Sequence, residues 1–212
     1  NANLYGNDVA LVEINPQELE KRHTTWREYS LIESNPRDSF RSEMTWNEFE
    51  RKANRMANFL LSRNIRKGNK VAILLMNCLE WLPIYFGILK IGALAVPLNF
   101  RYSSDEIDYC LNLADISVLF FGPEFIGRLE AISDKIISHR LLIYVGEGLA
   151  PTFSESYFMS AMNYSSENLS IEISDDDDAA IYFSSGTTGF PKAILHKHRA
   201  LMHSAICEQQ HH

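Results

Sequence analysis

Apolar and polar positions follow two kinds of spacing along the chain, which predict strands and helices. Apolar runs at residues 9–14, 71–76, 93–97, 117–121, 141–145 and 179–183 predict short buried strands. Helical spacing of apolar positions predicts helices at residues 45–63, 80–91, 103–114 and 125–137. Because strands alternate with helices, we expect an α/β fold with a mainly parallel sheet flanked by helices.

Two of these helices have recognisable start signals. Thr45 with Glu48, and Ser103 with Glu106, each form a capping box, which bonds the free backbone N–H groups of the first turn. The first of these helices is amphipathic, and we expect its polar face to carry Arg51, Lys52, Asn54 and Arg55. Its apolar face is expected to consist of Trp46, Phe49, Ala53, Met56, Ala57, Leu60 and Leu61.

Other segments are mostly polar. Residues 146–174 are rich in Ser, Asn, Pro and Gly and are interpreted as a surface connection with one short helix near residues 157–162. The acidic run at residues 175–178 fits a solvated loop before a buried strand better than a cation site, because four adjacent carboxylates cannot all face one ion. Residues 18–36 give no clear element, although residues 25–29 repeat the helix-start pattern of residues 45–49.

Composition narrows the class of protein. Of the 212 residues, 46% are hydrophobic and 22% are charged, which is typical of a globular protein rather than a disordered one. The net charge of −7 argues against a dedicated nucleic-acid binder but leaves room for a locally basic phosphate site. The apolar stretch at residues 71–100 is interrupted by Glu80 and Lys90, so no transmembrane segment is expected.

Cysteines and histidines carry little sign of a structural site. Three cysteines without a CxxC pair do not form a disulfide framework, and with no visible signal peptide we expect a cytoplasmic protein. Five of the seven histidines lie between residues 196 and 212, but their spacing fits no known metal-ligand pattern. No metal site is therefore predicted from these residues.

The most informative segment follows the apolar run at residues 179–183. It contains two glycines, four hydroxyl side chains and a lysine, namely Ser184, Ser185, Gly186, Thr187, Thr188, Gly189 and Lys192. Glycines let successive backbone N–H groups converge on an anion, the hydroxyls add donors, and lysine adds a positive charge for phosphate. Since open α/β sheets bind ligands at the carboxyl ends of their strands, the loop is a candidate phosphate site.

Two better-known phosphate motifs are absent from this loop. No Gly-Lys-Ser/Thr follows a four-residue gap, which excludes a Walker A loop, and GxGxxG is missing. The composition alone also fits a flexible polar loop without a ligand.

The segment at residues 181–192 closely resembles the signature loop of the adenylate-forming (AMP-binding) enzymes. Residues 45–49 resemble the early helix start of this family, residues 68–77 its Gly-Asp-x-Val-Ala strand with Asn69 in place of Asp, and residues 90–101 a segment typical of its acyl-CoA synthetases. The chain departs from the family pattern at Ala193, where Gly is common, and at Lys197, where Ser or Thr is usual. His198 matches a family histidine at a strand-to-helix step and is interpreted as structural.

The resemblance implies an activity and a set of ligands. Family members join a carboxylic acid to ATP as an acyl-adenylate, and acyl-CoA synthetases pass the acyl group to coenzyme A. Mg²⁺ accompanies ATP in this reaction. Residues at the family's loop positions would hold the β- and γ-phosphates: Ser184, Ser185, Gly186, Thr187, Thr188, Gly189 and Lys192.

The resemblance also bounds what the chain contains. Residues 1–212 correspond to an incomplete, N-terminal portion of the AMP-binding domain, without its C-terminal part or the C-terminal lid domain, so we expect no activity from this portion alone. The acid cannot be named, and a homo-oligomer stays open. Two alternatives remain, a non-catalytic phosphate- or partner-binding module and a fragment of an amino-acid adenylation domain.

Overall fold

The computed structural model describes residues 1–14, 41–184, 189 and 191–211. The polar segment at residues 18–36, the repeat at residues 25–29, and Ser185, Gly186, Thr187 and Thr188 lie outside these ranges. The described strands are β1 (Val9–Ile14), β2 (Arg41–Thr45), β3 (Lys70–Leu74), β4 (Leu94–Pro97), β5 (Ile116–Phe121), β6 (Leu141–Tyr144), β7 (Glu155–Ser156), β8 (Asp178–Ser184) and β9 (Lys192–Lys197).

The described helices lie between these strands. They are α1 (Ala2–Tyr5), α3 (Trp46–Ser62), α4 (Trp81–Lys90), α5 (Ser104–Leu113), η1 (Pro123–Phe125), α6 (Ile126–Glu130), α7 (Ser133–Ile136), α8 (Tyr157–Ser160), η2 (Ala161–Asn163) and α9 (His198–His211). None of them has the length and apolar content needed to span a bilayer.

A seven-stranded sheet organises the molecule, with strands in the order β7-β6-β5-β3-β4-β8-β9. Every neighbouring pair is parallel except β8–β9, which is antiparallel. Strands β1 and β2 form a separate antiparallel pair. The mainly parallel α/β sheet expected from the sequence is therefore confirmed, with one antiparallel strand, β9, that the apolar pattern did not predict.

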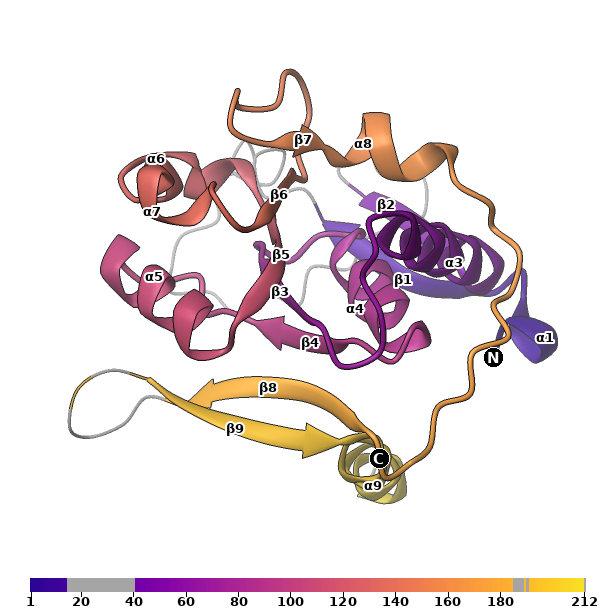
Figure 1. Ribbon diagram of the computed structural model, residues 1–212. Coiled ribbons are helices and arrows are strands. Elements are labelled where there is room, and N and C mark those ends of the chain that lie inside the picture. The colour runs from indigo at the N-terminus through magenta and orange to yellow at the C-terminus, as the bar shows by residue number, and fades with distance from the viewer. Residues whose placement is uncertain (15–40, 185–188, 190, 212) are drawn as a thin grey trace, which may run out of the picture.

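Helices cover both faces of the central strands (Figure 1). Alternate residues of β3 point to opposite faces, because side chains alternate along a strand. Val71 and Ile73 pack in one buried cluster with side chains of α3 and α4. Ala72 and Leu74 pack in the other with side chains of α5, α6 and α7. The strands that are buried on both faces are those that appear in the sequence as unbroken apolar runs.

Both predicted capping boxes are present. The Thr45 backbone N–H donates to Glu48 Oε2 at 2.8 Å, and the Glu48 N–H donates to Thr45 Oγ1 at 3.3 Å. The Ser103 N–H donates to Glu106 Oε2 at 2.8 Å, and the Glu106 N–H donates to Ser103 Oγ at 3.3 Å. The helices begin where these local signals place them.

Asn54 is a correction to the expected polar face of α3. Only 2% of this residue is exposed. Its Nδ2 donates to the Ser166 carbonyl oxygen at 2.9 Å and to Asn168 Oδ1 at 3.0 Å. The prediction was wrong because the connection after η2 crosses this part of the helix, a contact between residues more than 100 positions apart.

The single helix expected at residues 125–137 is also wrong. The structure has η1, α6 and α7 over residues 123–136 instead. The Ser133 hydroxyl donates to the Glu130 carbonyl oxygen at 2.9 Å, which gives that carbonyl a side-chain partner where α6 ends. Leu129, Ile132 and Ile136 are nevertheless all buried, so the apolar periodicity that suggested one helix reflects a shared core face.

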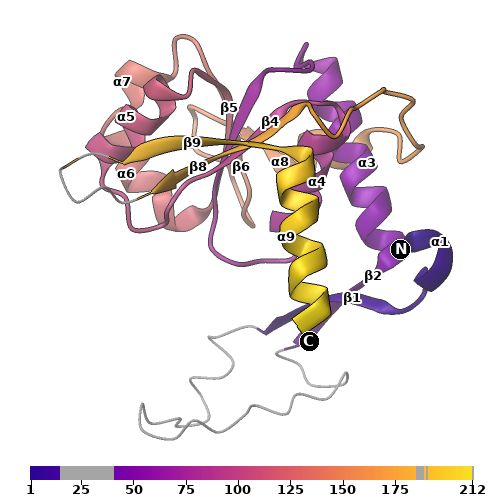
Figure 2. The same ribbon diagram turned by 90° about the horizontal axis from the view of Figure 1, so that it is seen from below.

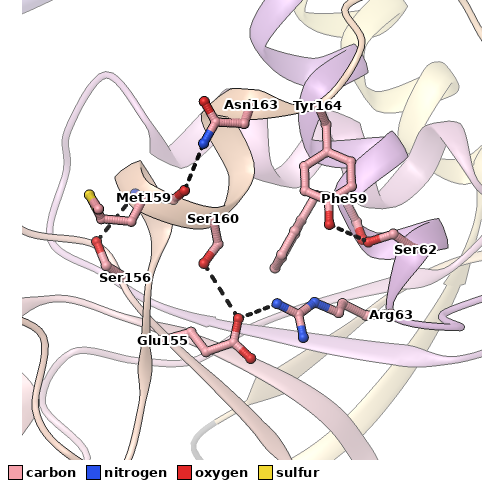
Figure 3. Close-up of polar contacts among 9 residues, drawn as sticks. All are labelled: Phe59, Ser62, Arg63, Glu155, Ser156, Met159, Ser160, Asn163 and Tyr164. Carbon is pink, nitrogen blue, oxygen red and sulfur yellow. Dashed lines mark hydrogen bonds and ion pairs between the residues drawn. The ribbon is translucent and has the colours of Figure 1, made fainter.

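The connection from β7 to β8 is held against α3, as Figure 3 shows. Arg63 forms an ion pair with Glu155, and Ser160 Oγ donates to Glu155 Oε2 at 3.4 Å. Ser62 Oγ donates to the Tyr164 hydroxyl oxygen at 2.9 Å, and the Tyr164 ring meets Phe59 edge-on at 5.5 Å between centroids. These contacts fix the path of the expected surface connection, which contains α8 where a short helix was predicted.

Candidate functional site

The candidate loop joins two antiparallel strands. Ser184, the last residue of β8, lies opposite Lys192, the first residue of β9. Gly189 has a φ of +127°, a backbone conformation that side-chain-bearing residues rarely adopt. The pairing brings the two ends of the loop together.

The loop lies at the edge of the sheet where parallel strands end. Strand β8 runs parallel to β4, with Ala180 beside Ala95, so both strands end at the same edge. In Figures 1 and 2 the Ser184 end of the hairpin lies on the side where α5 and α6 are found. This is the edge at which open α/β sheets bind their ligands.

Three of the seven predicted site residues lie within the described residues. Ser184 is half-buried, and Gly189 and Lys192 are exposed. Within the described part of the chain Lys192 makes no ion pair, which leaves its ammonium available to an anion. Ser185, Gly186, Thr187 and Thr188 lie outside the described residues, so their part in the site stays a prediction.

The turn after β4 lies at the same edge as the loop. Arg128 Nη1 donates to the carbonyl oxygens of Phe100 at 2.6 Å and Tyr102 at 3.0 Å. The Arg101 guanidinium lies 5.3 Å from the centroid of the Phe100 ring and belongs to an exposed residue. Sequence reasoning missed Arg128, because it acts from α6 on backbone atoms of a different segment.

Ion pairs stabilise the other end of the β8–β9 hairpin, where β8 begins and β9 ends. Asp177 bonds Lys67 and accepts from the Ser174 N–H at 2.8 Å. The bond from Lys67, followed by that from Ser174, holds the pKa of this carboxyl below its usual value. Asp176 pairs with Arg199 at 2.7 Å. The acidic run is thus mostly exposed and lies at the start of β8, but Asp177 is half-buried and two of the carboxylates anchor neighbouring elements.

His198 occupies the expected step from strand to helix, as the first residue of α9. Its backbone N–H donates to the Asp177 carbonyl oxygen at 3.1 Å. Burial lowers the pKa of the imidazole, and among the described residues its buried Nε2 has no hydrogen-bond partner. The residue is far along β9 from Lys192, which fits a structural role.

A tyrosine pair links the hairpin to α4. The hydroxyls of Tyr85 and Tyr182 lie 2.8 Å apart, and the Tyr182 ring meets His196 edge-on at 5.2 Å between centroids. Burial and the bond to Tyr182 raise the pKa of Tyr85 above its ordinary value. Tyr85 therefore stays protonated, and the hydroxyl pair holds β8 against α4.

Metal ligands do not gather anywhere in the described residues. No group of three or more His, Cys, Asp or Glu side chains there has the geometry to hold an ion. On α9, Cys207 Sγ and His203 Nε2 lie 3.6 Å apart, but they form only a pair.

Comparison with known proteins assigns the family. The model of the family described as "AMP-binding enzyme" matches residues 19–212. Since this match spans most of the chain, the chain belongs to the AMP-binding enzyme family.

Each relative described here matches more than two thirds of this chain, whereas this chain matches only about 30% of each relative. The crotonobetaine/carnitine–CoA ligase of Salmonella paratyphi B is 35% identical over 148 residues, which are 68% of this chain and 29% of that ligase. The crystal structure of the anthranilate CoA ligase AuaEII with anthranoyl-AMP is similar with a TM-score of 0.71 and 30% identity, over 74% of this chain and 30% of that one. ATP-bound MatB from Rhodopseudomonas palustris has a TM-score of 0.67 and 27% identity, over 78% and 32%. The chain thus spans about 30% of the length of these relatives.

Proposed function

We propose that the chain is the N-terminal part of the AMP-binding domain of an ATP-dependent ligase, which activates a carboxylic acid as an acyl-adenylate and transfers it to coenzyme A. The observation that carries this proposal is the pairing of Ser184 with Lys192. It sets the ends of a Gly-, Ser- and Thr-rich loop at the edge where open α/β sheets bind their ligands, which supports a phosphate site there. The family match gives the same loop an adenylate-forming context.

Each type of residue in the loop has a proposed task. The backbone N–H groups around Gly186 and Gly189, with the hydroxyls of Ser184, Ser185, Thr187 and Thr188, would bind the β- and γ-phosphates. Lys192 would add a positive charge to the same phosphates. Attack of the carboxylate on the α-phosphorus releases pyrophosphate, so holding its charge in place lowers the barrier. ATP would enter as its Mg²⁺ complex, and the loop hydroxyls are oxygen donors of the kind that Mg²⁺ accepts.

The names of the relatives favour coenzyme A as the acceptor. The relatives and structures described above are all CoA ligases or MatB, and a 30% identical relative from Mycolicibacterium smegmatis is a medium/long-chain-fatty-acid and 3-oxocholest-4-en-26-oate–CoA ligase. Their acids differ widely in size and polarity. We therefore propose the class of reaction, which is the ligation of a carboxylic acid to coenzyme A. We name no particular acid.

We also propose a domain extent and a compartment. Residues 1–212 would form an incomplete AMP-binding domain, since they span about 30% of the relatives. Cys78, Cys110 and Cys207 are all free thiols, which fits the reducing cytoplasm.

The proposal is tested by acid-dependent exchange of labelled pyrophosphate into ATP, measured on the full-length protein with a panel of aliphatic acids, aromatic acids and amino acids. At least one acid is expected to raise exchange well above the acid-free rate. No exchange with any acid would contradict the enzyme, and exchange only with amino acids would favour an amino-acid adenylation domain.

Calorimetry on the 212-residue chain then separates a ligase fragment from a stand-alone binding module. Weak or absent binding of ATP and pyrophosphate is expected, because most of a relative's length is missing. Tight binding by this chain, without exchange activity in the full-length protein, would favour a non-catalytic module.

A further inference from the structure

The β9 end of the sheet is not covered as the rest of the sheet is. Strand β9 has a neighbour on one side only, β8. Its adjacent residues Ile194 and Leu195 point to opposite faces and are 45% and 54% exposed. Sheets built mainly from parallel strands are normally covered on both faces, so this end has apolar surface on each face that nothing in the described chain shields.

Helix α9 is uncovered too. No described residue of α9 is buried as a whole, and Met202 and Ile206 are 63% and 45% exposed. The helix is 14 residues long, a length at which an isolated helix is only marginally stable in water. A helix of this kind needs an apolar face packed against something else to persist.

Side chains of α4 and α9 line a wide apolar groove between the two helices. Its volume is about 890 Å³, and most of its lining is apolar. From α4 it is lined chiefly by Trp81, Leu82, Phe86 and Leu89, and from α9 by Leu201, Met202, Ala205 and Ile206. An exposed apolar groove of this size marks a surface that binds something.

The position of the groove argues against the substrate acid as its occupant. Helix α9 begins at the end of β9 opposite Lys192, and the six residues of β9 span roughly 20 Å at about 3.3 Å per residue. An acid lying between the helices would hold its carboxylate far from phosphates bound at the loop. The hydroxyls of Tyr85 and Tyr182, which also line the groove, already bond each other.

The part of the relatives that this chain does not match points to a polypeptide as the occupant of the groove. The matched residues are 29% of the Salmonella ligase, so more than two thirds of that enzyme has no counterpart here. We propose that the α4–α9 groove, with the exposed faces of β9, is the packing face for polypeptide that follows α9 in the full-length protein. The proposal rests on the domain extent proposed above and adds which surface makes the contact.

Glutamate substitutions in the groove test this directly. Met202→Glu and Ile206→Glu are made in the 212-residue chain and in the full-length protein, with Ser204→Glu as the control on an α9 residue that does not line the groove. In the short chain all three variants should melt within about 1 °C of the parent, because surface substitutions away from packed features cost little. In the full-length protein the two groove variants should melt at least about 4 °C lower, and Ser204→Glu should not, because only the groove charges become buried.

Hydrogen exchange provides a second readout on the parent proteins. Amides of residues 199–210 should exchange at least about ten-fold more slowly in the full-length protein than in the short chain. Equal exchange and equal melting shifts in both proteins would overturn the proposal, as would a full-length protein that adds no residues after α9.

The other possible occupant is a second copy of this chain. Sedimentation of the 212-residue chain over a range of concentrations should show a monomer. A dimer that Met202→Glu dissociates and Ser204→Glu does not would assign the groove to a second copy and overturn the proposal. None of these measurements uses catalysis, so a failure of pyrophosphate exchange would leave their outcome intact.

Discussion

At the scale of single residues, polar side chains either bond backbone groups within one helical turn or join segments that are far apart in the chain. The capping boxes at Thr45 and Ser103 depend on residues three positions apart, and both were predicted. Asn54 was misplaced because its partners, Ser166 and Asn168, come from a segment over 100 residues later. Asn54 lies among arginines and lysines in the sequence. Nothing in its neighbours distinguishes a buried asparagine that bonds a distant segment from an asparagine on a solvated face.

Replacing Asn54 tests the value of that clasp. Asn54→Ala removes both donated bonds and leaves the Ser166 carbonyl oxygen and the Asn168 side chain without this partner. We expect a loss of about 1–3 kcal/mol in the free energy of unfolding, measured by urea denaturation. Asn163→Ala is the control, since within the described residues its Nδ2 bonds only the Met159 carbonyl oxygen, at an exposed position. An equal effect of both changes would contradict the account.

Asp177 links the stability of the hairpin to pH. Its pKa is lowered in the folded chain by Lys67 and then Ser174, so the ionised form stabilises the fold. This contribution is present above the ordinary value of 3.8 and is lost as the pH falls through the lower folded value. Asp177→Asn should therefore reduce the loss of melting temperature on acidification below about pH 4, while the exposed Asp178→Asn should change it less. Parallel acid melting curves for parent and Asp177→Asn would contradict this role.

At the scale of elements, the apolar pattern identified the buried strands but not the edge. Strands β3 and β5 are buried on both faces and are therefore continuous in the sequence. Strand β9 was missed because it begins and ends with a lysine, Lys192 and Lys197, and because its first four residues are exposed. Its sequence pattern is therefore that of a loop. The break between α6 and α7 was missed because both helices present apolar residues to one core at helical spacing.

The contact between α3 and α4 can be tested with a pair of glycines. A Cβ at Gly87 would lie 2.6 Å from Met56 Cγ and 2.9 Å from the Ala53 carbonyl oxygen, whereas a Cβ at Gly127 on α6 would meet nothing within 4 Å. Gly87→Ala should destabilise the fold by about 1–3 kcal/mol through overpacking. Gly127→Ala should be neutral or stabilise it by up to about 1 kcal/mol, because alanine favours helix. Thermal melting of both variants provides the comparison, and a harmless Gly87→Ala would show that the helices separate easily.

At the scale of the whole molecule, the fold class and the family could be predicted from the sequence. The spacing of the residues did not show whether the chain contains a complete site. The alternation of strands and helices predicts the sheet, and the loop after β8 lies at the edge where open α/β sheets bind their ligands. Which strand neighbours which depends on long-range pairing, so the order β7-β6-β5-β3-β4-β8-β9 had no local signal. The tyrosine contact between β8 and α4, and the groove beside it, likewise appear only once the chain is folded.

The most direct test of the central claim is the effect of Lys192→Ala on acid-dependent pyrophosphate exchange by the full-length protein. Lys197→Ala is its matched control, a lysine at the other end of β9 that faces Asp176 instead of the loop. If Lys192 holds the departing pyrophosphate, its loss should lower the maximal exchange rate about 10²- to 10³-fold, with little change in the acid concentration that gives half-maximal exchange. Lys197→Ala should retain the parent rate within a few-fold. Equal rates for the two variants, or an effect of Lys192→Ala on acid affinity alone, would contradict a phosphate-binding role for the β8–β9 loop.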